Sequence, residues 1–207
     1  MLKRTKGRML LTLLVITGLA GTLKDNTISQ KDRKFSVNLM KDTRTEVLKS
    51  VKGLSDAQLN FKAGPDHRSV KECIYHIAIS EKNLWDMLER SMKNPATPEK
   101  RSEIKMTDEQ LINMMEDRGD KIKTVDSFES ENTPYKSLAD ALTAFKSSRA
   151  DHIKYIKSTT EDLRNHIVQM PFGSIDCYQL SLMIVSHSNK HLQQINEIKA
   201  DTGFPNQ

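Results

Sequence analysis

The chain has 207 residues, of which 37% are hydrophobic and 5% aromatic, so it suits one domain with a modest core and favours helices over sheets. Its formal net charge of +5 includes four basic residues among the first eight, and residues 9–207 together have a net charge of +1. A balance this close to neutral excludes the broad basic surface that nucleic-acid binding needs.

The first 20 residues have the pattern of a secretory signal peptide. The basic stretch "MLKRTKGR" precedes the apolar run "MLLTLLVITGLA", and Gly18 and Ala20 supply small residues before a cleavage point. The apolar run has 12 residues, against the roughly 20 that span a bilayer, so cleavage is favoured and an uncleaved anchor is the alternative. We therefore expect an exported protein, periplasmic or extracellular, that meets a membrane only if this segment is retained.

The polar, patternless residues 21–34 predict a flexible linker, and residues 35–205 predict a bundle of helices. Ser69 with Glu72, and Thr107 with Gln110, form capping boxes that mark helix starts. Further N-cap candidates are Thr133, which precedes a proline, and Ser174. Together with the apolar periodicity, these signals predict helices at residues 35–53, 70–92, 108–126, 134–160 and 175–201.

No stretch alternates apolar and polar residues for long enough to predict a strand. The expected fold class is therefore all-α, a four-helix bundle in which the third and fourth predicted segments form one interrupted pair. Cys73 and Cys177 lie among apolar neighbours in predicted helices, and two cysteines make no disulfide framework. We expect both to be buried free thiols.

The last predicted helix carries two histidines on its apolar face. At 100° per residue, one narrow stripe contains Leu180, Ile184, His187, His191, Ile195 and Ile198. Residues four apart on a helix lie within about 6 Å at Cβ, so both imidazoles can reach one divalent metal ion. Burying an imidazole without a partner costs roughly 1–3 kcal/mol, and a shared metal ion would remove that cost for both.

Two ligands from one helix rarely suffice, so a third is expected from a facing helix. His76 is the best placed, because it lies in the middle of the second predicted helix beside an apolar stripe. We expect His67 to be exposed, His152 to be half-buried and His166 to be peripheral. The HExxH motif of zinc proteases is absent from the pair, since a serine follows its first histidine.

Three interpretations follow. The protein is a metal-dependent enzyme with His76, His187 and His191 as ligands, or a non-catalytic bundle that binds a metal or a partner, or a structural bundle whose core histidines lie far from one another. Gln194, one turn after His191, either bonds to a ligand or only packs. Tyr75, Ser80 and Asn83 are candidates for lining the site, and packing explains each of them as well.

The stretch "LSDAQLNFKAGPDHRSVKECIYHIAISE", followed later by "HSNKHLQQINEIKADTGFP", resembles the DinB/YfiT-like superfamily of four-helix bundles. That family has a capped helix with one histidine and a last helix with HxxxH and Gln-Ile, and it often ends in Gly-Phe-Pro. The matching residues, within a resemblance that spans 36–205, are His76, His187, His191, Gln194, Ile195, Gly203, Phe204 and Pro205. A tryptophan that often precedes the capping serine is replaced by His67 and Arg68, which implies a wider entry to the site.

The resemblance implies that His76, His187 and His191 hold a divalent metal ion, Zn, Ni, Mn or Fe, with an open position for water or an anionic substrate group. It also implies either a hydrolase or a transferase that uses a low-molecular-weight thiol, acting on a small molecule of unknown identity. Because such thiols are scarce outside the cell membrane, hydrolysis fits an exported chain better. Relatives often dimerise, which makes a homodimer an expectation.

Overall fold

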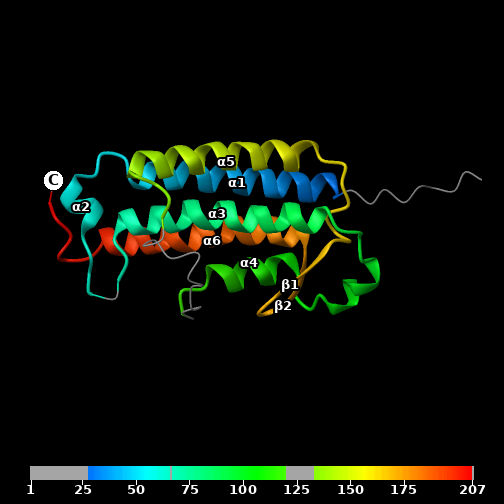
Figure 1. Ribbon diagram of the computed structural model, residues 1–207. Helices are drawn as coiled ribbons and strands as arrows, with labels where there is room; N and C mark the ends of the chain where they lie inside the picture. The colour runs from blue at the N-terminus through cyan, green and yellow to red at the C-terminus, as the bar shows by residue number, and fades with distance from the viewer. Residues whose placement is uncertain (1–27, 66, 120–132, 207) are drawn as a thin grey trace, which may run out of the picture.

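The computed structural model describes residues 28–65, 67–119 and 133–206. Figure 1 shows its long helices, which are α1 (Gln30–Ser50), α3 (Val70–Met92), α5 (Leu138–Ser158) and α6 (Cys177–Lys199). The shorter elements are α2 (Asp56–Asn60), the 3₁₀ helix η1 (Pro98–Glu103), α4 (Asp108–Glu116), β1 (Ile167–Met170) and β2 (Gly173–Asp176). The predicted signal segment 1–20 lies outside the described residues. Among the helices that are described, none is long and apolar enough to cross a membrane.

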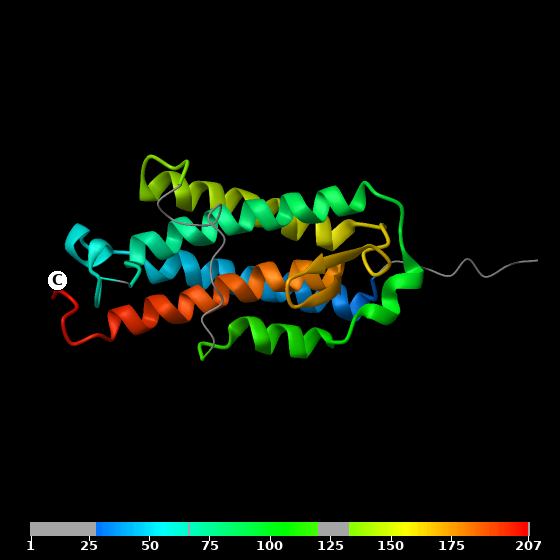
Figure 2. The same ribbon diagram turned by 60° about the horizontal axis from the view of Figure 1, so that its bottom comes forward.

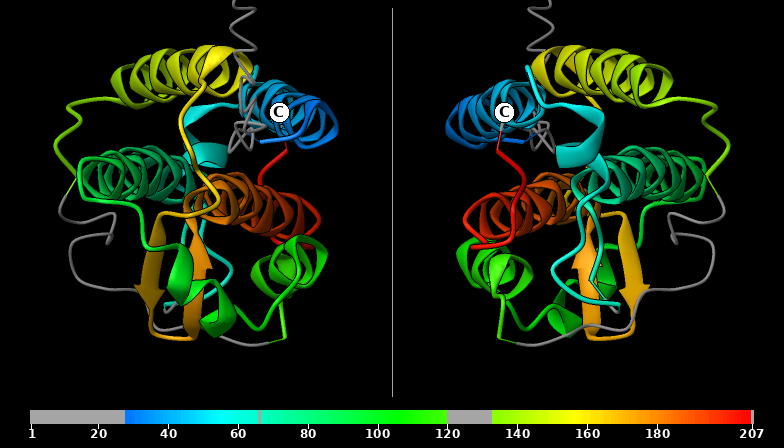
Figure 3. Two further views of the ribbon diagram at one scale, coloured as in Figure 1. Left: turned by 90° about the vertical axis from the view of Figure 1, so that its right-hand side faces the viewer. Right: turned by 90° about the vertical axis from the view of Figure 1, so that its left-hand side faces the viewer.

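The long helices form a two-by-two array when viewed along the bundle (Figure 3). α3 packs against α5 and α6, and α1 packs against the same two helices from the opposite corner. α3 and α5 run in one direction, and α1 and α6 run in the other (Figure 1). α4 covers the outer side of α6 (Figure 2). Because α3 and α6 are antiparallel neighbours, residues in the middle of one helix face the middle of the other.

Local signals located the ends of α3 correctly. The backbone N–H of Glu72 donates to Oγ of Ser69 at 3.2 Å, and the Ser69 N–H donates back to the Glu72 carboxylate at 2.8 Å. The helix ends at Met92, as predicted. The capping box of Thr107 and Gln110 also forms and starts α4. Both boxes work because the two partners are three residues apart and need nothing distant in the chain.

The first helix begins earlier than predicted, inside the segment 21–34 that we expected to be a linker. Its first residue is Gln30, because Oγ of Ser29 accepts a hydrogen bond from the Asp32 N–H at 3.0 Å and caps the helix. The weakly apolar sequence of its first turns hides this start, since few of those side chains enter the core. The third predicted helix stops early, because α4 ends at Glu116. Residues 120–126 of that prediction lie outside the described residues.

The fourth predicted helix begins later than expected. Oγ of Thr133 accepts the N–H of Tyr135 at 3.2 Å and forms a local turn instead of a helix cap. The helix α5 starts after Ser137, whose Oγ accepts the N–H of Asp140 at 3.1 Å. A serine or threonine beside a proline is therefore an ambiguous start signal, since it can cap a helix or close a turn.

The all-α prediction is wrong for residues 167–176, which form a β-hairpin. β1 and β2 pair in antiparallel register, with Val168 opposite Ile175. Gly173 follows the turn with φ of +128°, a conformation that favours glycine. Each strand has four residues, too few for alternation to stand out in the sequence.

Because of the hairpin, the last helix starts later than predicted, at Cys177. Ser174, predicted as its cap, lies in β2 and donates to Glu103 at 3.1 Å. Asp176 caps α6 instead, since its carboxylate accepts the N–H of Gln179 at 2.7 Å. The helix that carries two of the three candidate ligands therefore begins at a different residue from the one expected.

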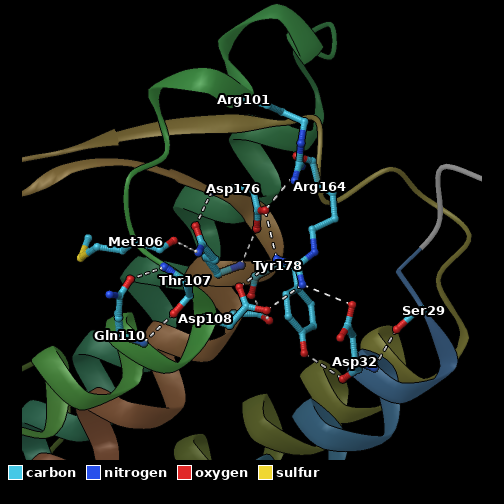
Figure 4. Close-up of polar contacts among 12 residues, drawn as sticks. Ser29, Asp32, Arg101, Met106, Thr107, Asp108, Gln110, Arg164, Asp176 and Tyr178 are labelled. Carbon is cyan, nitrogen blue, oxygen red and sulfur yellow. Dashed lines mark hydrogen bonds and ion pairs between the residues drawn. The ribbon is translucent and has the colours of Figure 1, made fainter.

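An arginine outside the helices ties together the starts of α1, α4 and α6 (Figure 4). Arg164 lies 2.7 Å from Asp108 and 3.2 Å from both Asp32 and Asp176. Each carboxylate stands at a helix N-terminus, where negative charge is favourable. The guanidinium also lies over the ring of Tyr178 at 4.0 Å. These contacts hold the beginning of α6 in place and thereby set the positions of its histidines.

Candidate metal centre

Three histidines from α3 and α6 converge between the two helices. His76 and His191 are buried, and His187 is half-buried. Nε2 of His187 lies 3.2 Å from Nε2 of His76 and 3.2 Å from Nε2 of His191. The structure thus brings together all three residues that the sequence singled out. The interpretation in which they lie far apart in the core is wrong.

Helix geometry explains why these three side chains meet. His187 and His191 are four residues apart on α6, which places them on one face in adjacent turns. His76 lies seven residues after the cap of α3, about 10 Å along the helix axis. Because α3 packs along α6, this point on α3 meets His187, near the middle of α6.

The spacing of the ring nitrogens fits a metal ion bound between them. Imidazole nitrogens lie about 2.0–2.1 Å from zinc, so tetrahedral geometry separates two of them by about 3.3 Å and octahedral geometry by about 2.9 Å. The two observed separations of 3.2 Å fall in this range.

Hydrogen bonds among the three rings, without a metal ion, would leave some of the Nε2 atoms without a partner. Nδ1 of His191 bonds to Oε1 of Gln194 at 3.0 Å, so Nδ1 carries the proton and Nε2 presents a lone pair. A neutral His187 has at most one proton on Nε2 and must face His76 and His191 with that one atom. It cannot complete two separate hydrogen bonds in that way, whereas a cation would satisfy every Nε2 lone pair at once.

The electrostatics of the site keep the imidazoles of His187 and His191 neutral. Burial, followed by the neighbouring imidazoles of His191 and His76, lowers the pKa of His187 well below its usual value. Burial and His76 together lower the pKa of His191 to about 3, although the bond from Gln194 acts in the opposite direction. Neutral rings at physiological pH are the form that binds metal ions.

The other histidines are accounted for by different contacts. His67 is exposed, as predicted. His166 is half-buried and bonds to the backbone oxygens of Asp162 and Asn94 at 2.8 and 3.1 Å. His152, expected to be half-buried, is fully buried and stacks on Trp85 with ring centroids 3.7 Å apart.

A buried ion pair beside the centre was missed at the sequence level. Arg149 of α5 donates to Glu81 of α3 at 2.5 and 2.6 Å, and His152 bonds to the same carboxylate at 2.8 Å. Arg149 also donates to Oγ of Ser188, the residue after His187, at 3.0 Å. Burial alone would raise the pKa of Glu81, and the charge of Arg149 reverses this and lowers it. The signal that could have found the pair is a glutamate and an arginine on otherwise apolar helix faces.

A surface groove of about 330 Å³ lies elsewhere, between α3 and α5, where Trp85, Met92 and Tyr155 line it. None of the three converging histidines belongs to its lining. We therefore assign the candidate centre to the converging imidazoles and not to the groove, which contains none of these possible metal ligands.

Comparisons with known proteins identify the family and the fold of the chain. The family model of the DinB superfamily matches residues 39–195. YuaE, an uncharacterised protein of Bacillus subtilis (strain 168), is 24% identical over 165 residues that cover 79% of this chain and 96% of YuaE.

Among solved structures, YfiT from Bacillus subtilis is described as a probable metal-dependent hydrolase with an unusual four-helix bundle topology. It aligns with a TM-score of 0.59 and 15% identity over 86% of this chain and 92% of YfiT, which shows a shared fold. Since the family model matches most of its length, the chain belongs to the DinB superfamily.

Proposed function

We propose that the protein binds one divalent metal ion through Nε2 of His76, His187 and His191 and hydrolyses a small-molecule substrate at that site. The observation that carries the proposal is that three imidazoles converge, with Nε2 of His187 lying 3.2 Å from Nε2 of each of the other two. The description of YfiT as a probable metal-dependent hydrolase supports the reaction class, because the two chains share a fold.

His76, His187 and His191 would hold the ion and leave one position open, and a divalent ion bound there would supply polarisation of a substrate oxygen and a lowered pKa for a bound water. The chain's own residues hold and orient the ligands. Gln194 fixes the tautomer of His191, and the cap at Ser69 fixes the first turns of the helix that carries His76.

The proposed activity is tested with protein purified without a histidine tag and loaded separately with Zn, Mn, Ni or Fe. Each form is assayed against ester and amide substrates, and against thiol transfer, beside the double variant His187→Ala, His191→Ala. We expect hydrolysis by the loaded protein and none by the variant. Thiol transfer in place of hydrolysis would assign a transferase, and bound metal without either reaction would favour the non-catalytic metal-binding bundle.

We also propose that the protein is exported, on the basis of the signal pattern in residues 1–20. The measurement is the mass of the protein recovered after expression of the full chain. Loss of about 20 residues from protein found outside the cytoplasm is the expected result. An intact chain in the membrane fraction would favour the uncleaved anchor, and an intact chain in the cytoplasm would contradict export.

A further inference from the structure

Three buried serine hydroxyls have no hydrogen-bond partner within the described residues: Ser36, Ser80 and Ser186. Buried serines in helices commonly donate to a carbonyl of the preceding turn. Ser181 and Ser188 of α6 do so, at 2.7 and 3.1 Å. A buried hydroxyl without a partner destabilises a fold, so each of the three needs an explanation.

The position of Ser80 differs from that of the other two, because it lies one turn after His76 on α3. Ser80 is 1% exposed and stands about 40° from His76 around the helix axis, on the side that faces α6. Residues spaced in this way have Cβ atoms within about 6 Å of each other. Helical side chains also lean toward the N-terminus, so the Ser80 side chain leans toward the turn that carries His76.

Ser186 faces a different helix, although it precedes His187 in the sequence. Gln179 and Gln193 lie seven residues to either side of Ser186, on the same face of α6. Gln179 bonds to the backbone oxygen of Met106 at 2.9 Å and Gln193 to that of Glu116 at 3.4 Å, and both oxygens belong to α4 or the segment before it. Ser186 therefore faces α4, and Ser36 lies on α1, which supplies no histidine to the centre.

Two basic residues lie in or next to the helices that carry the candidate ligands. Lys190 lies between His187 and His191 on α6, and Arg68 directly precedes the cap of α3. A positive field of this kind raises the local concentration of anions.

We propose that the hydroxyl of Ser80 donates a hydrogen bond to an oxygen of an anionic group, such as a carboxylate, that occupies the open position of the metal ion. Ser80 is then a substrate-binding residue, and the substrate class is a small molecule with an oxygen anion. This inference rests on the metal centre proposed above. The hydroxyl has no partner in the protein because its partner is the ligand.

The test uses untagged protein loaded with cobalt(II), whose visible absorption reports ligands that bind to the metal. Acetate is titrated into the wild type, Ser80→Ala and Ser186→Ala, and imidazole is titrated as a second probe. Acetate offers an oxygen to Ser80, whereas bound imidazole has no acceptor left for its hydroxyl. We expect Ser80→Ala to bind acetate roughly three- to tenfold more weakly, with imidazole binding unchanged, and Ser186→Ala to match the wild type.

The outcomes separate the two proposals. If the wild type binds no cobalt, the metal centre itself is wrong. If the wild type and Ser80→Ala bind cobalt and acetate equally, the centre stands and the role of Ser80 is overturned. If Ser80→Ala weakens acetate and imidazole alike, the serine supports the shape of the site, and its role as a hydrogen-bond donor to the ligand is likewise overturned.

Discussion

Gln194 accepts a hydrogen bond from Nδ1 of His191 at 3.0 Å, one turn further along α6. The bond sets which ring nitrogen of His191 carries the proton and turns Nε2 toward the other two histidines. The sequence left open whether Gln194 bonds to a ligand or only packs, and the structure shows that it bonds to His191. Contacts of this kind to the far nitrogen of a ligand commonly account for about 10- to 100-fold in metal affinity.

We predict that Gln194→Leu lowers zinc affinity by about 10- to 100-fold, because the ring of His191 loses its fixed orientation. The affinity is measured by competition with a chromophoric chelator. Gln193→Leu is the matched control, since Gln193 points toward α4 and bonds to the backbone of Glu116. Equal affinities for the two variants would show that Gln194 does not support the centre.

The buried pair of Glu81 and Arg149 predicts a large effect on stability. In Glu81→Gln, the guanidinium of Arg149 stays buried without a counter-charge, and we expect the free energy of unfolding to fall by about 3–5 kcal/mol. Urea denaturation followed by circular dichroism measures the loss. Lys82→Met is the control on the next residue, because Lys82 pairs with Asp86 at the surface and its removal costs less than about 1 kcal/mol. A small effect of Glu81→Gln would mean that water or rearrangement compensates the arginine.

The histidine pKa values predict how the metal-free protein responds to acid. The pKa of His191 is about 3 in the folded state, against 6.5 for an ordinary histidine. Between these values the unfolded imidazole binds a proton and the folded one does not, so the free energy of unfolding falls as the pH is lowered. Each such histidine contributes up to about 1.4 kcal/mol per pH unit.

Carboxylates also make the free energy of unfolding depend on pH. Comparing the wild type with His191→Asn separates the part that is due to His191 from the part that is due to the carboxylates. Both proteins are unfolded with urea in the presence of a chelator at pH values from 7.5 to 4.5. We expect the wild type to lose stability more steeply below pH 6.5 than the variant. Parallel curves would mean that the ring of His191 takes up a proton in the folded protein as readily as it does in water.

The two cysteines are predicted to be unreactive in the folded protein. Burial raises the pKa of Cys73 to about 12 and that of Cys177 to about 11, so neither forms a thiolate near neutral pH. A thiol reagent should therefore label neither residue in native protein and both in urea. Rapid labelling of native protein would contradict this burial.

Local sequence signals predicted part of this fold, because they depend on residues close together in the chain. The capping box at Ser69 located α3, and the i,i+4 pair at His187 and His191 marked one face of α6. The hairpin was missed, since its strands are short and are held by pairing across a turn. The pair of Glu81 and Arg149 was missed because 68 residues separate the partners.

The third histidine, His76, could be predicted only in part from local sequence signals. Spacing could not join His76 to His187, which lies 111 residues away. Its place beside the apolar stripe of a helix, together with the family resemblance, was sufficient to select it. What the sequence could not supply is the order in which the helices pack, and that order decides which buried side chains meet.

The most direct measurement is the zinc content of untagged protein and of six single histidine-to-alanine variants after loading and dialysis. We predict one zinc per chain for the wild type and for the variants at His67, His152 and His166, and loss of most zinc for those at His76, His187 and His191. His67 and His166 are the firmest controls, because His152 also supports a buried ion pair. Zinc retained in full by all three variants of the converging histidines, or absent from the wild type, would contradict the metal centre.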